Sequence, residues 1–214
     1  MSVAAEDLAK PVLVGRSSSH FTRVTRVFAS ETGVEHAFQV VRDLMSLDPE
    51  DYGGNPALKL PSLRTARGVW FGALNICREL SRMSRVGPQV VWPEQLVEPL
   101  LANAQELVAQ AMTTEVTLIL SRLAGRGEGN SHQVKMEKSL THTLSWLDDN
   151  VEGVLAALPR ERGLSYLEVT MFCLISHLEF RDVVPIAVYG RLNAFCRAFA
   201  SRPSIQQTAY RFDS

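Results

Sequence analysis

The segment Asn55-Pro56-Ala57-Leu58-Lys59-Leu60-Pro61-Ser62-Leu63 decides how the first half of the chain folds. Its apolar run is too short for a helix, and the residues from Ser62 to Thr65 form a candidate strand. Proline cannot donate a hydrogen bond to a sheet, so Pro61 belongs at the first position of this strand or on a sheet edge. An X-Pro bond is also the one place where a cis peptide costs little. We predict that Leu60-Pro61 is cis and turns the backbone N–H and C=O of Leu60 outward, ready to pair with an extended, peptide-like ligand.

A strand and a helix are predicted before this segment. Pro11 to Val14 form a short apolar run ended by Gly15, which is typical of a buried strand. The serines Ser17–Ser19 favour the start of a helix. The apolar face of that helix consists of Phe21, Val24, Val27 and Phe28. Arg23 and Arg26 fall outside this face.

The remaining patterns of the first half complete a mixed sheet with helices on its faces. They predict strands over 36–41 and 69–71 and a helix over 73–83. From Pro93 onward the patterns are helical, with long amphipathic segments on either side of a glycine-rich break at 125–130. We therefore predict an α/β domain over residues 1–83, a linker over 84–91 and an all-α domain over 92–214.

The helical half contains one clear helix start. Ser165 is followed three residues later by Glu168, the spacing of a capping box, in which each side chain satisfies a backbone donor of the other residue. The helix after it is nearly all apolar, which predicts that it forms the buried centre of the bundle. Its apolar positions include Met171, Leu174, Ile175 and Leu178. The last predicted helix runs over 189–200 and stops before Pro203.

Composition excludes several classes of protein. A net charge of -1 gives no basic surface for nucleic acid. No apolar run reaches the length of a membrane-spanning helix, and the N-terminus lacks the pattern of a signal peptide. Cys77, Cys173 and Cys196 are scattered among apolar residues, which predicts buried free thiols and a cytoplasmic protein. The histidines show no ligand spacing, so we predict no metal site.

The order of motifs resembles that of the cytosolic glutathione transferases. Four segments follow one another in the order found in that family: Val12-Leu13-Val14-Gly15, Ser17-Ser18-Ser19, Asn55-Pro56 and Lys59-Leu60-Pro61-Ser62-Leu63. Near the C-terminus, Tyr189-Gly190-Arg191-Leu192 and Arg202-Pro203-Ser204 also look like family motifs. The resemblance spans nearly the whole chain. It implies the glutathione transferase fold: a thioredoxin-like α/β N-terminal domain followed by an all-α C-terminal helical bundle.

The resemblance also implies roles for particular residues. Ser19 aligns with the catalytic residue, whose hydrogen bond favours the glutathione thiolate, and Ser17 and Ser18 are rivals for that role. Ser17 and the segment Lys59, Leu60 and Pro61 are expected to bind glutathione. His20 stands where the family often has proline, and we expect its side chain to be exposed. Met112, Thr113 and Phe172 could line a pocket for an electrophile, although core packing is the simpler expectation for Phe172.

The chain departs from the family at Gly72 and Ala73. The family has an acid and a serine there, which bind the γ-glutamyl amine and carboxylate of glutathione. Only the backbone N–H of Ala73 at a helix start remains for this purpose, and Arg64 and Arg67 could add charge nearby. A lost charge-assisted hydrogen bond costs roughly 1.5–3 kcal/mol, about tenfold to a hundredfold in affinity.

These observations leave open two functions. One is a glutathione transferase that conjugates glutathione with an apolar electrophile, with Ser19 stabilising the thiolate. The other is a non-catalytic protein of the same fold that binds a ligand or partner. Ser19, Leu60 and Pro61 favour the first, and Gly72 and Ala73 favour the second. The resemblance further implies a homodimer, in which the first domain of each subunit packs on the helices of the other.

Overall fold

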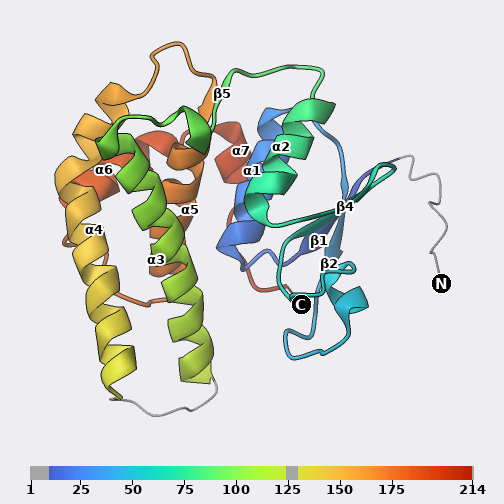
Figure 1. The fold of residues 1–214 in the computed structure, drawn as a ribbon, viewed down its shortest axis with the longest axis horizontal. Helices are drawn as coiled ribbons and strands as arrows, with labels where there is room; N and C mark the ends of the chain where they lie inside the picture. The colour runs from blue at the N-terminus through green and yellow to red at the C-terminus, as the bar shows by residue number, and fades with distance from the viewer. Residues whose placement is uncertain (1–9, 124–129, 214) are drawn as a thin grey trace. The chain divides into compact units, whose positions relative to one another are not determined.

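The structure, a computed structural model, describes residues 10–123 and 130–213. It divides the chain into two compact units (Figure 1). The first unit holds residues up to Pro88 together with the segment from Arg202, and the second runs from Gln89 to Ser201. The predicted glycine-rich break lies mostly outside the described residues.

The first unit is a four-stranded mixed sheet with two long helices. Its elements are β1 (Val12–Gly15), α1 (His20–Glu31), β2 (Ala37–Val40), a 3-10 turn η1 (Pro49–Tyr52), β3 (Ser62–Thr65), β4 (Gly68–Phe71), α2 (Ala73–Met83) and, from the end of the chain, α7 (Pro203–Gln207). The strand order is β2-β1-β3-β4, with β2 parallel to β1 and β3 antiparallel to both its neighbours. This is the thioredoxin-like domain that the sequence predicts.

The core of this unit follows the predicted apolar pattern. Leu13 and Val14 of β1 and Val24, Val27 and Phe28 of α1 are buried. The helix ends where Gly33 takes a positive φ of 64°, a conformation that glycine adopts without strain. The Leu60-Pro61 peptide bond is cis, as predicted.

The expected exposure of the His20 side chain on α1 is wrong, and a second polar side chain of this helix is buried too. Arg23 lies outside the apolar face, but its guanidinium donates a hydrogen bond to the carbonyl of Ile205 and stacks on the ring of Tyr210. His20 is also buried, and its ring packs edge-on against Phe21 with centroids 4.4 Å apart. Neither contact can be read from the apolar periodicity of the helix.

The end of the chain packs with the first unit, although the predicted range 92–214 assigned it to the helical domain. An ion pair holds it there: the guanidinium of Arg202 donates to both carboxylate oxygens of Glu31, at 2.8 and 3.0 Å. Ser204 donates a further hydrogen bond to Glu31. These contacts are polar, so a search for apolar helix faces misses them.

The second unit is a helical bundle. Its elements are a short strand β5 (Val90–Val91), a 3-10 turn η2 (Pro93–Gln95), α3 (Pro99–Leu123), α4 (Ser131–Ala157), a short strand β6 (Leu164–Ser165), α5 (Tyr166–Phe180) and α6 (Gly190–Phe199). As predicted, α5 is the buried centre, with Met171, Leu174, Ile175 and Leu178 all inaccessible. No helix in the described part of the chain has both the length and the apolar character needed to cross a membrane.

The predicted capping box is absent from the start of α5. Ser165 pairs with Val91 as the last residue of β6, and its hydroxyl makes no capping bond to α5. Glu168 instead receives two hydrogen bonds, at 2.7 and 2.8 Å, from the guanidinium of Arg162. The sequence spacing of a capping box is therefore present without its hydrogen bonds, and the Glu168 carboxylate pairs with Arg162 instead.

The Glu31–Arg202 pair should contribute to stability at neutral pH. Burial alone would raise the pKa of Glu31, but hydrogen bonds from Arg202 and Ser204 outweigh it, so the pKa lies below its ordinary value. We expect Glu31→Gln to lower the free energy of unfolding by about 1–3 kcal/mol, between the values for exposed and buried pairs. This intermediate range applies because the side chains of Glu31 and Arg202 are 19% and 32% exposed, so the pair is only partly buried.

The pH dependence has a definite sign. A carboxylate with a depressed pKa stabilises the fold above its unfolded pKa, and this contribution is lost as the pH falls through the folded pKa. Urea unfolding across the acidic range should therefore show a loss in the wild type that Glu31→Gln lacks. Glu35→Gln is the matched control, because Glu35 pairs with Lys10 on the exposed surface. Equal stability of both variants would contradict this account.

Candidate functional site

The register of the sheet brings the predicted site residues to one edge, which is the end of the sheet where β1 and β4 finish and β3 begins. Val14 of β1 lies opposite Ser62 of β3, and Ser62 lies opposite Phe71 of β4. The loop that follows β1, the Leu60-Pro61 bond that precedes β3 and the Gly72-Ala73 pair that follows β4 therefore meet at the same end. The N–H of Gly72 donates to the carbonyl of Pro61 at 3.3 Å, which ties two of these segments together.

Ser19 is the N-cap of α1. Its Oγ accepts a hydrogen bond from the N–H of Thr22 at 3.3 Å, and its backbone is extended. Capping uses an acceptor lone pair, so the hydroxyl proton stays available for a ligand. Ser19 is also the only half-buried residue of the three serines, since Ser17 and Ser18 are 1% and 8% exposed. The structural role and the predicted catalytic role are thus compatible in one side chain.

Gly15 allows α1 to begin this close to the sheet. A Cβ at this position would lie 2.6 Å from Oγ1 of Thr22 and 2.4 Å from its methyl carbon. The same Thr22 hydroxyl accepts a hydrogen bond from the N–H of Arg16 at 3.4 Å. The glycine that ends the predicted strand therefore sets where the first turn of α1, with its free N–H groups, meets the end of β1.

Asn55 holds the segment that leads to Leu60-Pro61. Its side-chain amide donates to the carbonyl of Lys59 at 2.7 Å, and its Oδ1 accepts from the N–H of Ala57 at 3.0 Å. The side chain of Lys59 is exposed. Beyond the proline, the hydroxyl of Ser62 donates to the carbonyl of Tyr52 at 2.7 Å. These hydrogen bonds hold the backbone on either side of Leu60.

Gly72 and Ala73 form the start of α2. Gly72 is the N-cap, with φ 79° and ψ 143° and no side-chain cap. Ala73 is buried. This end of α2 therefore offers backbone N–H groups with positive partial charge, and no acid.

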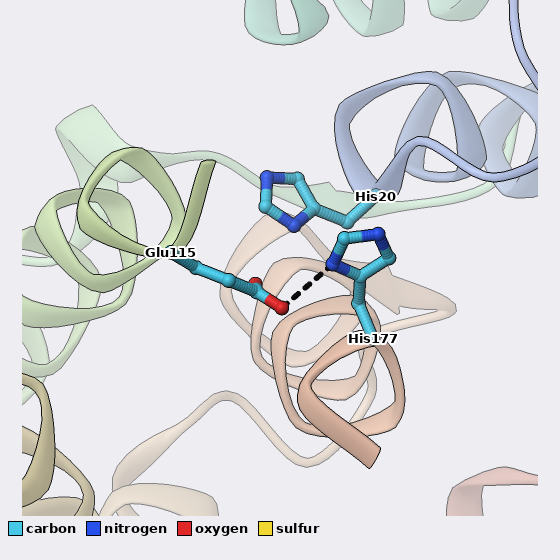
Figure 2. A group of neighbouring side chains, drawn as sticks. All are labelled: His20, Glu115 and His177. Atoms are coloured by element: carbon cyan, nitrogen blue, oxygen red, sulfur yellow. Dashed lines mark hydrogen bonds and ion pairs between the residues drawn. The ribbon is translucent and has the colours of Figure 1, made fainter. Parts of the chain in front are cut away.

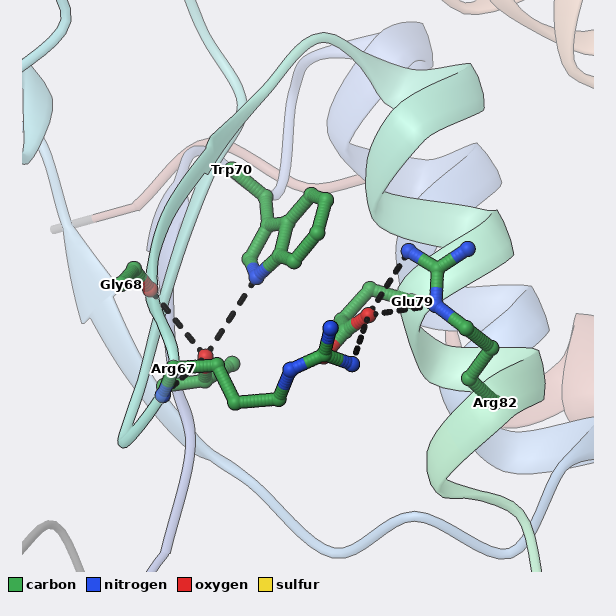
Figure 3. Close-up of polar contacts among 6 residues, drawn as sticks. Arg67, Gly68, Trp70, Glu79 and Arg82 are labelled. Carbon is green, nitrogen blue, oxygen red and sulfur yellow. Dashed lines mark hydrogen bonds and ion pairs between the residues drawn. The ribbon is translucent and has the colours of Figure 1, made fainter.

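Arg64 and Arg67 are engaged by other residues. Arg64 donates to Gln39. Arg67 lies 3.4 Å from both oxygens of Glu79, which Arg82 also binds at 2.7 Å. Figure 3 shows both guanidinium groups beside the indole of Trp70, with their carbons 5.7 and 5.1 Å from its ring centre. The two guanidinium groups compensate the charge of Glu79, whose side chain is almost inaccessible.

The second unit holds a buried ionisable pair that the sequence analysis missed. Nδ1 of His177 on α5 lies 2.7 Å from Oε1 of Glu115 on α3 (Figure 2). Both residues are buried. They are 62 residues apart, so no local spacing could reveal them. The contact fixes the orientation of the imidazole. His20, also labelled in Figure 2, belongs to α1 of the first unit.

The residues suggested for an electrophile pocket have other surroundings. Phe172 is buried against Phe199, with ring centres 5.4 Å apart, and Met112 is also buried. Thr113 is exposed, and its hydroxyl donates to the carbonyl of Ala109. A shallow groove of about 650 Å³ lies instead on α3 and α4. Its lining includes Leu107, Val134, Lys135, Lys138, His142 and Trp146, and none of the predicted glutathione-site residues.

Comparisons with known proteins support the fold. Residues 18–83 match the family model of the glutathione S-transferase N-terminal domain. No curated protein sequence matches the chain.

Solved structures of this fold cover both units. A glutathione S-transferase from Methylobacillus flagellatus KT, with GSH bound, is 20% identical, with a TM-score of 0.72 over 94% of this chain and 100% of that chain. A glutathione transferase family member from Pseudomonas fluorescens Pf-5, with bound glutathione, has 20% identity, a TM-score of 0.73 and the same coverage. The Tau class enzyme from mango has 15% identity and a TM-score of 0.71 over 95% of this chain and 94% of that chain. Residues 18–83 of this chain thus match the glutathione S-transferase N-terminal domain, and both units share the fold of these solved transferases.

Proposed function

We propose that this protein is a glutathione transferase that joins glutathione to an apolar electrophile. The observation that carries the proposal is the meeting of the Ser17–Ser19 loop, Leu60-Pro61 and Gly72-Ala73 at one edge of the sheet. Related structures of the same fold contain bound glutathione at low sequence identity, which supports glutathione as the ligand class.

Ser19 would stabilise the thiolate. Its hydroxyl would donate a hydrogen bond to the glutathione sulfur beside the positive end of α1. The hydrogen bond and the helix dipole would both lower the pKa of the bound thiol. The thiolate then forms a carbon–sulfur bond with the electrophile while the leaving group departs. The thiol proton passes to solvent. The hydroxyl itself is not consumed.

The backbone would hold the rest of glutathione. The N–H and C=O of Leu60 would pair with the cysteinyl part of the tripeptide, and the N–H of Ala73 would bind the γ-glutamyl carboxylate. Ser17 and Lys59 would line the same edge. The γ-glutamyl ammonium lacks the acid that the family supplies, so we expect weak binding.

A second function is a binding protein without transferase activity. Gly72 and Ala73 favour it, because a buried ammonium group needs an anionic or carbonyl partner. Two measurements separate the functions: a calorimetric titration with glutathione, and an assay of thiol transfer to a reactive aryl halide. Binding and transfer support the enzyme. Binding of glutathione without transfer supports the second function.

Ser19→Ala should reduce transfer sharply while glutathione affinity changes little, because this hydrogen bond matters mainly to the thiolate. The variant also loses an N-cap, which costs about 1 kcal/mol of stability. Ser19→Asp separates the two effects, since aspartate caps a helix but cannot donate a proton when ionised. Stability should recover in Ser19→Asp and transfer should not. Wild-type rates in Ser19→Ala would refute the role of the hydroxyl.

Restoring the γ-glutamyl contacts should tighten binding. Gly72→Glu with Ala73→Ser should raise glutathione affinity by about tenfold to a hundredfold, the value of a charge-assisted hydrogen bond. The change at Gly72 carries a conformational cost of about 1–3 kcal/mol, because its φ is 79°. Ala73→Ser alone needs no backbone change and tests the carboxylate contact separately. Unchanged affinity in both variants would exclude Gly72-Ala73 as part of the site.

Gly190→Ala is the matched control for loss of a glycine. A Cβ at Gly190 meets no atom within 4 Å, and its φ is not in the left-handed region. Urea unfolding should therefore show Gly72→Ala destabilised and Gly190→Ala near the wild type.

We also propose that the chain forms a homodimer, as the family resemblance implies. The end of α3 leaves Leu120 and Leu123 exposed, the latter by 72%. An exposed apolar face of this kind often marks a protein interface. Sedimentation velocity at micromolar concentration should show a dimer, and replacing both leucines by glutamine should weaken it. A wild-type monomer under these conditions would contradict the proposal.

A further inference from the structure

The segment from Arg202 to Asp213 runs along α1 in the reverse direction. It begins at the end of the helix, where Arg202 binds Glu31 and Gln207 accepts a hydrogen bond from Ser30. It continues past Arg23, which donates to the carbonyl of Ile205 and lies 4.2 Å from the ring centre of Tyr210. It then reaches the loop before the helix. All of these residues belong to the first unit.

At that loop, a carboxylate of this segment lies against the backbone. Oδ2 of Asp213 accepts a hydrogen bond from the N–H of Ser17 at 2.7 Å. The first turn of α1 contains no acidic residue of its own, so Asp213 supplies negative charge beside its positive end.

The side chain of Ser17 is a second sign of a binding site. Its hydroxyl oxygen is inaccessible and finds no hydrogen-bond partner among residues 10–123 and 130–213. Buried hydroxyls are normally paired, because an unpaired one loses its hydration without compensation. The loop therefore has an unused polar group next to the N–H that Asp213 occupies.

We propose that Asp213 fills an anion site at the Ser17–Ser19 loop, from which a ligand's thiolate or carboxylate must displace it. The segment 209–213 is then a competitor built into the chain. This inference rests on the proposed function, because the same loop carries Ser19.

The segment is suited to release. Residues 209–213 belong to no helix or strand. The hydroxyl of Thr208 donates to the carbonyl of Ser204 inside α7, and the Glu31–Arg202 pair holds the start of that helix. Asp213 can therefore leave the loop while α7 stays in place.

The test uses the full chain with Asp213→Ala, and with Asp213→Asn, which keeps an acceptor but removes the charge. Asp149→Asn is the matched control, because that carboxylate is 74% exposed on α4. Each protein is titrated with glutathione by calorimetry and with inorganic sulfate by the NMR shift of the Ser17 amide. Sulfate probes the anion site without relying on glutathione recognition.

We expect Asp213→Ala to bind both probes about tenfold more tightly than the wild type, because a charge-assisted hydrogen bond would keep the segment closed about nine-tenths of the time or more. The affinity of Asp213→Asn should lie between those of Asp213→Ala and the wild type, and the affinity of Asp149→Asn should match that of the wild type. Equal affinities of Asp213→Ala and the wild type for both probes would overturn the inference.

The two proposals fail in different ways. If no variant binds glutathione but Asp213→Ala binds sulfate more tightly, the inference stands and the proposed function fails. If all variants bind glutathione equally and sulfate equally, the proposed function stands and the competitor is excluded.

Discussion

The candidate site depends on one strand register. Pairing of Val14 with Ser62 and of Ser62 with Phe71 aligns the ends of three strands. A shift of one residue in β3 would send its side chains to the opposite face of the sheet. The buried hydrogen bond from Ser62 to Tyr52 and the Asn55 contacts oppose such a shift. The cluster of loops at this edge is thus a consequence of how the sheet packs.

The start of α1 then determines what chemistry this edge can support. Helix N-termini attract anions, and two side chains near the start of α1 affect anion binding in different ways. Ser19 offers a hydroxyl proton, and Asp213 offers a competing carboxylate. A thiolate arriving at this place would gain from the first and have to displace the second. The start of α2 has no such polar side chain, because Gly72 and Ala73 leave only backbone groups there.

The sequence predicted the elements well and the polar contacts poorly. Apolar periodicity located β1, α1, α2 and the buried helix α5, because burial of apolar faces determines these elements. It could not locate the packing of the last segment on α1, since Arg23, Glu31 and Arg202 act through hydrogen bonds between distant parts of the chain. Ser165 and Glu168 have the spacing of a capping box without its hydrogen bonds, because Glu168 pairs with Arg162 instead. The meeting of the candidate site residues depends on strand order and register, which the sequence analysis did not predict, and the Asp213 contact had no local signal at all.

The central claim is that glutathione binds at the sheet edge formed by the Ser17–Ser19 loop, Leu60-Pro61 and the start of α2. A titration of isotope-labelled protein with glutathione, followed residue by residue through the amide signals, tests it directly. The account predicts saturable shifts at Ser19, Leu60 and Ala73 with a single dissociation constant. Shifts confined to the groove of Lys135, Lys138 and Trp146, with none at the sheet edge, would contradict it.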